Sequence, residues 1–265
     1  MSSRIVSLVP SLSETIVELG PREALVGITK FCVEPPNLHR TAMIVGGTKD
    51  PDVAKIALLK PTHIITNAEE NKPEHIESCK TIAPTLVTFP KSPGDVPAML
   101  RDMGKFLGQE EPYTRLAMEL RDSQRAFGIG SDGDLSRHPE RSEGSRTYLY
   151  FIWTNPYMVV GPDTYISELL SLAGYRNLCQ TLRYPEMTME EIQRLRPDVI
   201  FFSTEPFPFR KRDAEAFRKA WPGSPPIMKI DGRLASWYGI TTKTALDEIR
   251  KLLLHENNKL LLGVL

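Results

Sequence analysis

Short apolar runs alternate along the chain with segments in which apolar residues recur every three or four positions. Short β-branched runs are typical of buried strands, and the longer spacing is typical of helices that pack by one face. In the first half, apolar runs lie at Arg4–Val9, Ala24–Thr29, His63–Asn67 and Leu86–Phe89, and a helical pattern lies at Asp52–Leu59. This alternation predicts an α/β fold with parallel sheets covered by helices on both faces.

A helix is expected directly after the first strand. Ser11 and Glu14 have the spacing of a capping box, in which a serine and a glutamate three residues later satisfy the first amides of a helix. Gly20 stands where that helix would end.

The same order of elements returns in the second half, with a strand at Arg146–Trp153 and a helix at Asp163–Gly174. The helix, proline and strand around Pro61 fall in step with those around Pro197: Ile56, Leu59 and Ile64 match Ile192, Leu195 and Ile200. We infer two related three-layer lobes.

Between the halves, Glu110–Phe127 carries apolar residues at helical spacing among charges, which predicts one long amphipathic helix joining the lobes. The segment after it is rich in Gly, Ser and charge, and it has too few apolar residues to bury itself. The predicted divisions are an N-terminal lobe at 1–109, a bridging helix at 110–128, a disordered insertion at 129–146, a C-terminal lobe at 147–240 and a C-terminal helix at 241–265.

Composition narrows the class of partner. The chain has 265 residues, which suits two domains, and its 33 basic and 33 acidic side chains cancel, so nucleic acid is not an expected partner. No apolar run reaches the roughly 18 residues of a membrane span, and the first residues lack the pattern of a signal peptide. The chain has three cysteines, Cys32, Cys79 and Cys179, which lie far apart in the sequence. An odd number at this spacing favours free thiols in a reducing compartment over a set of disulfides. We expect a monomer that is cytoplasmic as encoded, or extracytoplasmic if a leader has been removed.

Four segments carry a family resemblance. In order they are RIVSLVPSLSETIVELG, LVGITKFC, VGG followed by DPDVAKIALLKPTHII, and MEEIQRLRPDVIFFS. Together they resemble the class III substrate-binding proteins of ABC transporters, the helical-backbone family that includes cobalamin, haem and ferric-siderophore receptors. The resemblance spans nearly the whole chain apart from the insertion. It implies two α/β lobes on one backbone helix, a small ligand clamped between them, an ABC permease as partner, and neither a cofactor nor catalysis.

The stretches GITKFC, NAEEN, EPFPF and SWYG are most similar to a cobalamin-binding branch of that family. A corrinoid is therefore the first expected ligand, and a ferric siderophore or haem is the next. This chain departs from the known pattern of cobalamin receptors. The positions at which those receptors stack aromatic rings on the ligand are occupied here by Tyr184, Thr48 and Asn67. The positions of an acidic and a basic residue of that pattern are occupied by Ser236 and Ile240. The family's free-metal branch holds its ion with His and carboxylates, and no metal site is expected here because His39, His63, His75, His138 and His255 do not match those places.

The candidate site lies in the loops after the strands, because open α/β sheets bind ligands beyond the carboxyl ends of their strands. Aromatic rings in these loops suit a flat, partly apolar ligand, and Asn and Glu would orient its amides or polar edge. The candidate ligand-binding residues are Ser11, Phe31, Cys32, Thr48, Asn67, Glu69, Asn71, Trp153, Tyr157, Tyr184, Glu205, Phe207, Trp237 and Tyr238.

Some of these residues have a structural alternative. Trp153 ends an apolar strand and suits a core position equally well, and Phe207 lies among prolines that stiffen a loop plugging the lobe. Cys32 is expected to be an inert buried thiol rather than a cobalt or iron ligand. Trp237 and Tyr238, after an Asp-Gly-Arg turn, are expected to be exposed.

Two carboxylates, Asp52 and Glu190, stand at comparable helix starts in the two halves. In the resembled family such carboxylates dock on transporter arginines, and helix capping is the alternative. The chain contains no HExxH, GxSxG, Walker or GxGxxG motif, so no catalytic residue is predicted. A cytoplasmic tetrapyrrole enzyme and a repurposed binding or storage protein are the competing functions.

Overall fold

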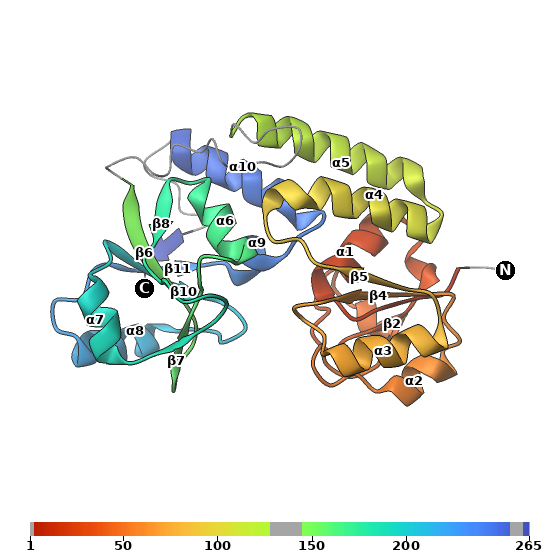
Figure 1. The fold of residues 1–265 in the computed structure, drawn as a ribbon, viewed down its shortest axis with the longest axis horizontal. Helices are drawn as coiled ribbons and strands as arrows, with labels where there is room; N and C mark the ends of the chain where they lie inside the picture. The colour runs from red at the N-terminus through yellow and green to blue at the C-terminus, as the bar shows by residue number, and fades with distance from the viewer. Residues whose placement is uncertain (1–2, 128–144, 255–261, 265) are drawn as a thin grey trace. The chain divides into compact units, whose positions relative to one another are not determined.

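The computed structural model describes residues 3–127, 145–254 and 262–264. The chain divides into two compact units (Figure 1). Unit 1 comprises Met1–Pro90, Asp95–Asp122 and Tyr238–Thr242, and unit 2 comprises Lys91–Gly94, Ser123–Trp237 and Lys243–Leu265. Each unit has its own sheet and its own apolar core. The α/β fold class expected from the sequence is confirmed, while the lobe boundaries drawn from the sequence stay a prediction.

Unit 1 is built on a five-stranded sheet in the order β3-β2-β1-β4-β5, and every neighbouring pair is parallel. The strands are β1 (Ile5–Ser7), β2 (Leu25–Ile28), β3 (Met43–Ile44), β4 (His63–Asn67) and β5 (Thr85–Thr88). Because all strands run the same way, the loops that follow them emerge at one edge of the sheet. That edge carries the candidate residues of the first half.

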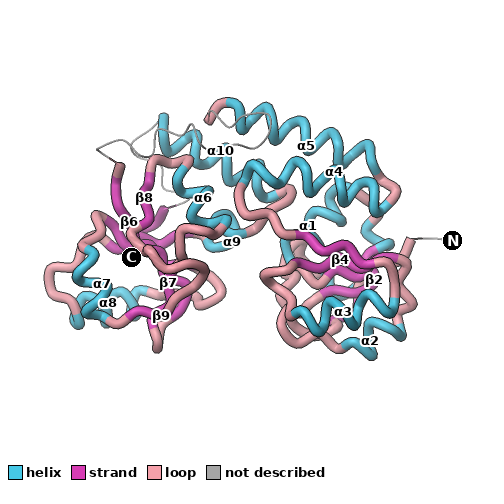
Figure 2. The backbone as a smooth tube through the Cα atoms, viewed as in Figure 1, coloured by secondary structure: helices cyan, strands magenta, loops and turns pink. Residues whose placement is uncertain are grey.

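Helices cover both faces of this sheet (Figures 1 and 2). They are α1 (Pro10–Leu19), α2 (Val53–Leu58), α3 (Pro73–Ile82), α4 (Val96–Leu107) and α5 (Glu110–Arg125). Three short 3-10 turns, Arg22–Ala24, Leu38–Arg40 and Pro93–Asp95, lie between them. Val6 and Ile64 pack with Ile56 of α2 and Cys79 of α3, so these two helices share one face of the sheet.

Helices α4 and α5 lie side by side as an antiparallel pair (Figure 2). Gly108 ends α4 in the left-handed conformation, at φ 65°. A Cβ atom on Gly104 would lie 2.8 Å from the Cβ atom of Tyr113, so this glycine lets the two helices approach closely. The sequence patterns singled out α5 but neither α3 nor α4.

Unit 2 contains a mixed sheet in the order β12-β11-β10-β6-β7-β9, with β8 also paired to β6. Its strands are β6 (Arg146–Trp153), β7 (Tyr157–Val159), β8 (Tyr175–Asn177), β9 (Glu186–Met187), β10 (Val199–Ser203), β11 (Ile227–Ile230) and β12 (Leu262–Val264). The central strands β6, β10 and β11 are parallel, as expected, but β7, β9 and β12 pair antiparallel. Its helices are α6 (Tyr165–Ser171), α7 (Met189–Leu195), α8 (Lys211–Ala220), α9 (Gly232–Ser236) and α10 (Thr241–Leu254).

Aromatic rings fill the core of unit 2. Phe202 stacks on Phe209 at 4.2 Å between ring centroids and meets Phe151 and Phe217 edge-on, each at 5.5 Å. Such pairs contribute about 0.5–1.5 kcal/mol each beyond the area they bury. This cluster holds α7 and α8 on one face of the sheet, whereas the Tyr148 hydroxyl points to the other face and bonds Ser167 of α6 at 3.3 Å.

Two expectations from the sequence need correction. Helix α1 begins at Pro10, its N-cap is Val9, and the capping box expected at Ser11 is absent because Pro10 occupies the first turn and has no amide to satisfy. The helix expected at 241–265 ends at Leu254. The apolar tail after it contributes β12, an antiparallel edge strand on β11, because extended backbone can satisfy its amides on the open edge of the sheet.

The insertion predicted at 129–146 lies almost entirely outside the described residues. Its last residue, Arg146, is the first residue of β6.

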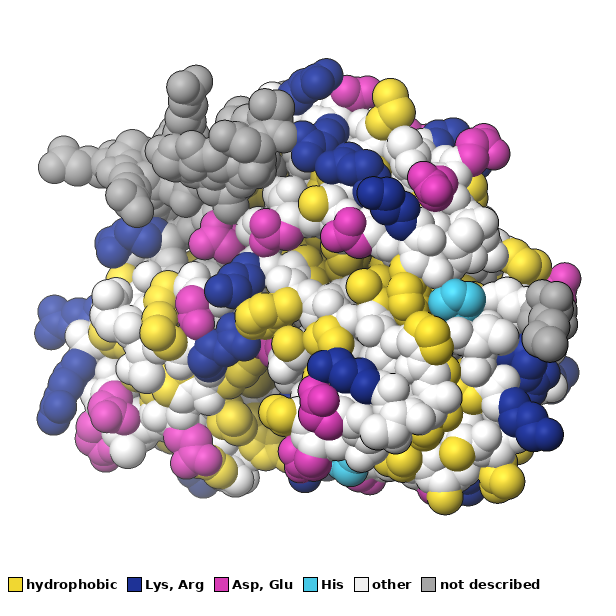
Figure 3. Space-filling view, turned by 45° about the vertical axis from the view of Figure 1, so that its right-hand side comes forward, with side chains coloured by type: hydrophobic (Ala, Val, Ile, Leu, Met, Phe, Trp, Pro, Cys, Tyr) yellow, Lys and Arg dark blue, Asp and Glu magenta, His cyan; other side chains and the backbone are white. Residues whose placement is uncertain are grey.

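Acidic and basic side chains are interspersed over the face drawn in Figure 3, as their equal numbers in the sequence allow. Several large apolar side chains are also exposed, among them Leu58 at 78% and Trp153 at 40%. Within the described ranges, no helix has the length and apolar character needed to cross a membrane.

Gly239 supplies a test of how the 238–242 segment packs on α1. Its φ is +95°, and an added Cβ atom would meet the Thr15 hydroxyl, which accepts a hydrogen bond from the Ile240 amide at 3.1 Å. We expect Gly239→Ala to lower the free energy of unfolding by roughly 2 kcal/mol or more, because backbone strain and a clash add. Gly108→Ala, at φ +65° with open space around it, should cost only about 1 kcal/mol. Equal losses in urea unfolding would mean that the contact with Thr15 does not constrain this segment.

Candidate functional site

One buried amide, that of Asn71, holds together the strand-end loops of unit 1. Asn71 is 1% exposed. Its Nδ2 donates to the carbonyls of Leu8 at 3.2 Å and Thr48 at 2.9 Å, and its Oδ1 accepts from the amide of Asn67 at 2.8 Å. One side chain therefore connects the loops that follow β1, β3 and β4.

Asn67 shapes the loop that follows β4. Its Oδ1 accepts from the amides of Glu69 at 2.7 Å and Glu70 at 3.0 Å, which is an Asx turn, and its Nδ2 donates to Thr88 Oγ1 at 3.3 Å. Asn67 and Asn71 thus satisfy their amides inside unit 1. This arrangement favours a structural role for both over contact with a ligand.

Two buried side chains near α1 differ in their hydrogen bonding. Cys32 Sγ lies 3.2 Å from Ser13 Oγ and 3.3 Å from Thr29 Oγ1. Burial raises the pKa of the Cys32 thiol, which favours the protonated, unreactive form. Ser11 is 2% exposed, and its hydroxyl has no hydrogen-bond partner among the described residues.

Tyr238 and Glu70 form a pair that the sequence does not reveal. The Tyr238 hydroxyl donates to Glu70 Oε1 at 3.0 Å across 168 residues of chain. Burial, together with the neighbouring Glu70 carboxylate, raises the pKa of Tyr238 well above its usual range, so the phenol stays protonated and donates. The only sequence signal for Glu70 is its place in the NAEEN segment after a predicted strand.

Trp237 and Glu205 form the matching pair in unit 2. Trp237 Nε1 donates to Glu205 Oε1 at 2.8 Å, and Ser236 Oγ lies 3.4 Å from the same oxygen. Burial raises the pKa of Glu205, while the bonds from Trp237 and Ser236 act against that rise. The expectation that Trp237 and Tyr238 are exposed is wrong: they are 8% and 7% exposed, because each ring buries itself with its polar atom bonded to a carboxylate.

A partly exposed aromatic surface involves the same loop as Glu205. Trp153, at the end of β6, meets Phe207 edge-on at 5.5 Å between centroids, and Phe207 meets Phe209 at 4.8 Å. Phe209 is 2% exposed and plugs the core of unit 2, whereas Trp153 is 40% exposed and is not a core residue. The loop after β10 thus carries a buried ring, a half-buried ring and the Glu205 carboxylate within five residues.

The other aromatic candidates are less suited to a ligand. The Tyr157 ring packs edge-on against Phe151 at 5.7 Å and Phe217 at 5.5 Å, which makes it part of the core of unit 2. Tyr184 is half-buried in the segment before β9. Phe31 is 48% exposed at the carboxyl edge of unit 1, with the ammonium of Lys30 5.2 Å from its ring centroid.

The two predicted docking carboxylates differ in their local roles. Asp52 caps α2, accepting from the Lys55 amide at 3.0 Å, and this bond lowers the pKa of Asp52. Glu190 is exposed in the first turn of α7, where Thr188 and Glu191 already form a capping box. Docking on a transporter stays a prediction for both.

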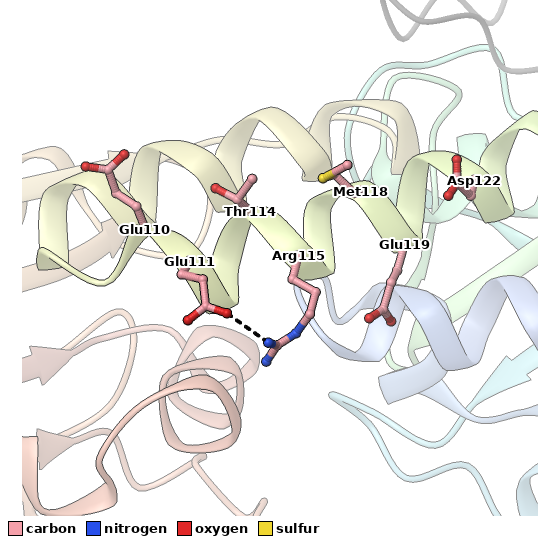
Figure 4. Close-up of a pocket in the computed structure, with 7 residues that line it drawn as sticks. All are labelled: Glu110, Glu111, Thr114, Arg115, Met118, Glu119 and Asp122. Atoms are coloured by element: carbon pink, nitrogen blue, oxygen red, sulfur yellow. Dashed lines mark hydrogen bonds and ion pairs between the residues drawn. The ribbon is translucent and has the colours of Figure 1, made fainter.

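The hollow in Figure 4 lies along one helix only. All of its lining residues belong to α5: Glu110, Glu111, Thr114, Arg115, Met118, Glu119 and Asp122. Arg115 is paired with Glu111 at 3.1 Å. This surface is acidic and separate in sequence from the strand-end loops, so we do not assign it to the candidate site.

Metal-binding side chains are scattered. Within residues 3–127, 145–254 and 262–264, no three His, Cys, Asp or Glu residues are grouped to hold an ion. His63 packs edge-on against Phe106 at 5.0 Å, and burial lowers its pKa. His138 and His255 lie outside the described residues.

Asn71→Ala tests the role of the buried amide. The variant leaves two carbonyls and one amide of the strand-end loops without partners, so we expect a loss of roughly 3 kcal/mol in the free energy of unfolding. Thr81→Ala removes an exposed hydrogen bond to the Ser78 carbonyl and should cost less than about 0.5 kcal/mol. A similar small loss for both variants, measured by urea unfolding, would contradict the scaffolding role.

Glu205 allows a test by pH. Glu205→Ala leaves Trp237 Nε1 buried without an acceptor and should cost about 1–3 kcal/mol, whereas Glu205→Gln keeps the acceptor. Burial raises the pKa of Glu205 above its usual value of 4.5 in the folded protein, so folding favours the protonated carboxyl. The stabilisation that results is fully present below pH 4.5 and is lost as the pH rises through the pKa of the folded state. The stability of Glu205→Gln relative to wild type should therefore increase between about pH 4 and pH 7. A flat difference across that range would mean that the carboxyl is not desolvated.

A family model described as periplasmic binding protein matches residues 5–222. Among curated proteins, the chain is 24% identical over 200 residues to a vitamin B12-binding protein of Pectobacterium atrosepticum, covering 74% of this chain and 70% of the relative. It is 25% identical over 205 residues to a cobalamin-binding protein of Halobacterium salinarum, covering 74% and 53%.

Solved structures share the fold. The periplasmic vitamin B12-binding protein BtuF of Vibrio cholerae matches with a TM-score of 0.78 at 18% identity, over 95% of this chain and 96% of that one. A periplasmic haem-binding protein of Pseudomonas aeruginosa matches with a TM-score of 0.79 at 20% identity, over 100% and 98%. With the family model covering most of its length, the chain belongs to the periplasmic binding protein family.

Proposed function

We propose that this protein is the monomeric substrate-binding component of an ABC-type uptake system, and that its ligand is a corrinoid. The observation that carries the proposal is that relatives from a bacterium and an archaeon, each matched over about three quarters of this chain, are named for binding vitamin B12 or cobalamin. The same names support binding rather than catalysis. The solved relatives are described as periplasmic, which supports an extracytoplasmic place of action.

The strand-end loops of unit 2 support the choice of ligand. The exposed Trp153 ring and the Phe207 ring beside it offer an apolar surface, on which a flat macrocycle gains contact with little loss of side-chain freedom. Glu205 stands on the same loop as Phe207 and supplies a polar group. Small-molecule sites commonly combine an apolar wall with a few fixed polar groups of this kind.

Titration of the purified protein with cyanocobalamin, followed by calorimetry, tests the proposal. We expect saturable one-to-one binding, weakened about tenfold or more in Trp153→Ala because an exposed ring that stacks on the ligand is lost. Leu58→Ala removes a side chain that is 78% exposed on α2, outside the strand-end loops, and should leave the affinity unchanged.

The same titration with dicyanocobinamide, haemin and a ferric siderophore identifies the ligand class. If haemin or the ferric siderophore binds more tightly than the two corrinoids, that compound would be identified as the ligand class in place of a corrinoid. Absence of binding to all four compounds would refute the proposed function.

A further inference from the structure

The Glu205 carboxylate is held by one oxygen only. Trp237 Nε1 and Ser236 Oγ both bond Oε1, at 2.8 Å and 3.4 Å. Among the described residues, no hydrogen bond is formed with Oε2, and this oxygen is not among the buried polar atoms that lack a partner. The carboxylate is therefore fixed in orientation while one of its oxygens can accept a hydrogen bond from a bound molecule.

The surrounding backbone fixes the position of Glu205 as well. Its amide lies 3.3 Å from Ser203 Oγ, and the Gly232 amide donates to Thr204 Oγ1 at 2.8 Å. A Cβ atom on Gly232 would lie 2.5 Å from Glu205 Cγ, so only glycine fits beside this side chain. A polar group held this rigidly pays little entropy on binding a ligand and can discriminate between ligands by charge.

Charges of both signs act on Glu205. Asp231 lies near enough to disfavour its ionised form, and Arg233 favours that form. Arg233 Nε lies 4.0 Å from Asp231 Oδ1, and the guanidinium lies 5.9 Å from the Trp237 ring. Arg233 thus lies close to both Asp231 and Trp237, and Arg210 adds a second cation at the end of the loop after β10.

The strand-end loops of unit 1 also carry charges of both signs. Glu69 and Glu70 follow β4, and the Lys49 ammonium bonds the backbone carbonyl of Glu69. The Lys30 ammonium lies 3.7 Å from the Asp50 carboxylate. Lys30 and Lys49 thus have acceptors within the unit itself.

We propose that Glu205 is a specificity-determining residue that selects ligands whose polar edge carries N–H donors, primary carboxamides above all, over ligands whose edge carries carboxylates. This inference rests on the proposed function, because it concerns which macrocycle the same site accepts. A carboxamide N–H donates to the open oxygen of Glu205. A ligand carboxylate in the same place meets a like charge that cannot turn away, since Trp237 and Ser236 fix it.

This selection separates the two macrocycles found among the relatives. The corrin ring of cobalamin carries carboxamide side chains, whereas haem carries two carboxylates on its edge. A fixed carboxylate acceptor suits the first and repels the second. Glu205 therefore favours an amidated corrinoid over haem at the proposed site.

The decisive experiment compares two corrinoids that share the corrin ring and differ in its side chains: dicyanocobinamide carries amides, and dicyanocobyrinic acid carries free carboxylates. Each is titrated by calorimetry at pH 7.5 into wild type, Glu205→Gln and Glu215→Gln, and haemin serves as a third probe. We expect the wild type to bind the amide about tenfold or more tightly than the acid. Glu205→Gln keeps an acceptor for Trp237 and should reduce the ratio of the two affinities at least about threefold. Glu215→Gln removes an exposed carboxylate on α8 and should leave that ratio unchanged.

The outcomes separate the two proposals. Corrinoid binding with equal affinity for amide and acid in the wild type, or a ratio that Glu205→Gln does not change, would overturn the role of Glu205 and leave the proposed function standing. Tighter binding of haemin than of either corrinoid would overturn both the role of Glu205 and the choice of ligand. Absence of binding to every probe would overturn the proposed function and this inference with it. The comparison in the wild type needs no variant, so a folding defect in Glu205→Gln does not prevent a decision.

Discussion

Burial of polar side chains at strand ends is the constraint on which both units depend. A buried amide or carboxyl is costly unless its donors and acceptors are paired or reach solvent, because the interior offers no water to replace a missing partner. In unit 1 this requirement is met by Asn71, which bonds the ends of two strands and the loop after a third. The hydrogen bonds of Asn71 therefore fix the strand-end loops of unit 1 without any contribution from a ligand.

Unit 2 meets the same constraint with fewer hydrogen bonds and more aromatic packing. Phe151 and Phe202 of adjacent strands make a ring cluster that reaches Phe209 in the loop after β10. Because Phe209 holds the far end of that loop in the core, Glu205 at its near end is presented in a defined place. Rigid support of this kind is what a binding group requires to distinguish one polar edge from another.

Local patterns in the sequence predicted several central strands well, and the contacts that they missed join residues far apart in the chain. The strands at His63–Asn67 and Arg146–Trp153 have the bounds expected from their apolar runs, since burial on both faces of a sheet leaves a continuous signal. The partner of Tyr238 lies 168 residues away, and no local pattern encodes that distance. Burial of Trp237 could not be predicted either. The polar residues beside it in the sequence suggest an exposed ring, and the Glu205 carboxylate that accepts from its indole lies 32 residues away.

The bond between Trp237 and Glu205 gives this protein an internal reporter. The chain has three tryptophans, and their indole N–H groups differ in surroundings: Trp153 is 40% exposed, Trp221 packs at the margin of the aromatic core, and Trp237 is bonded to a carboxylate. A charged acceptor deshields the donated proton and slows its exchange with solvent. The three indole signals of a nitrogen-15 NMR spectrum thus sample an exposed strand end, the margin of an aromatic core and a hydrogen bond to a carboxylate within one small unit.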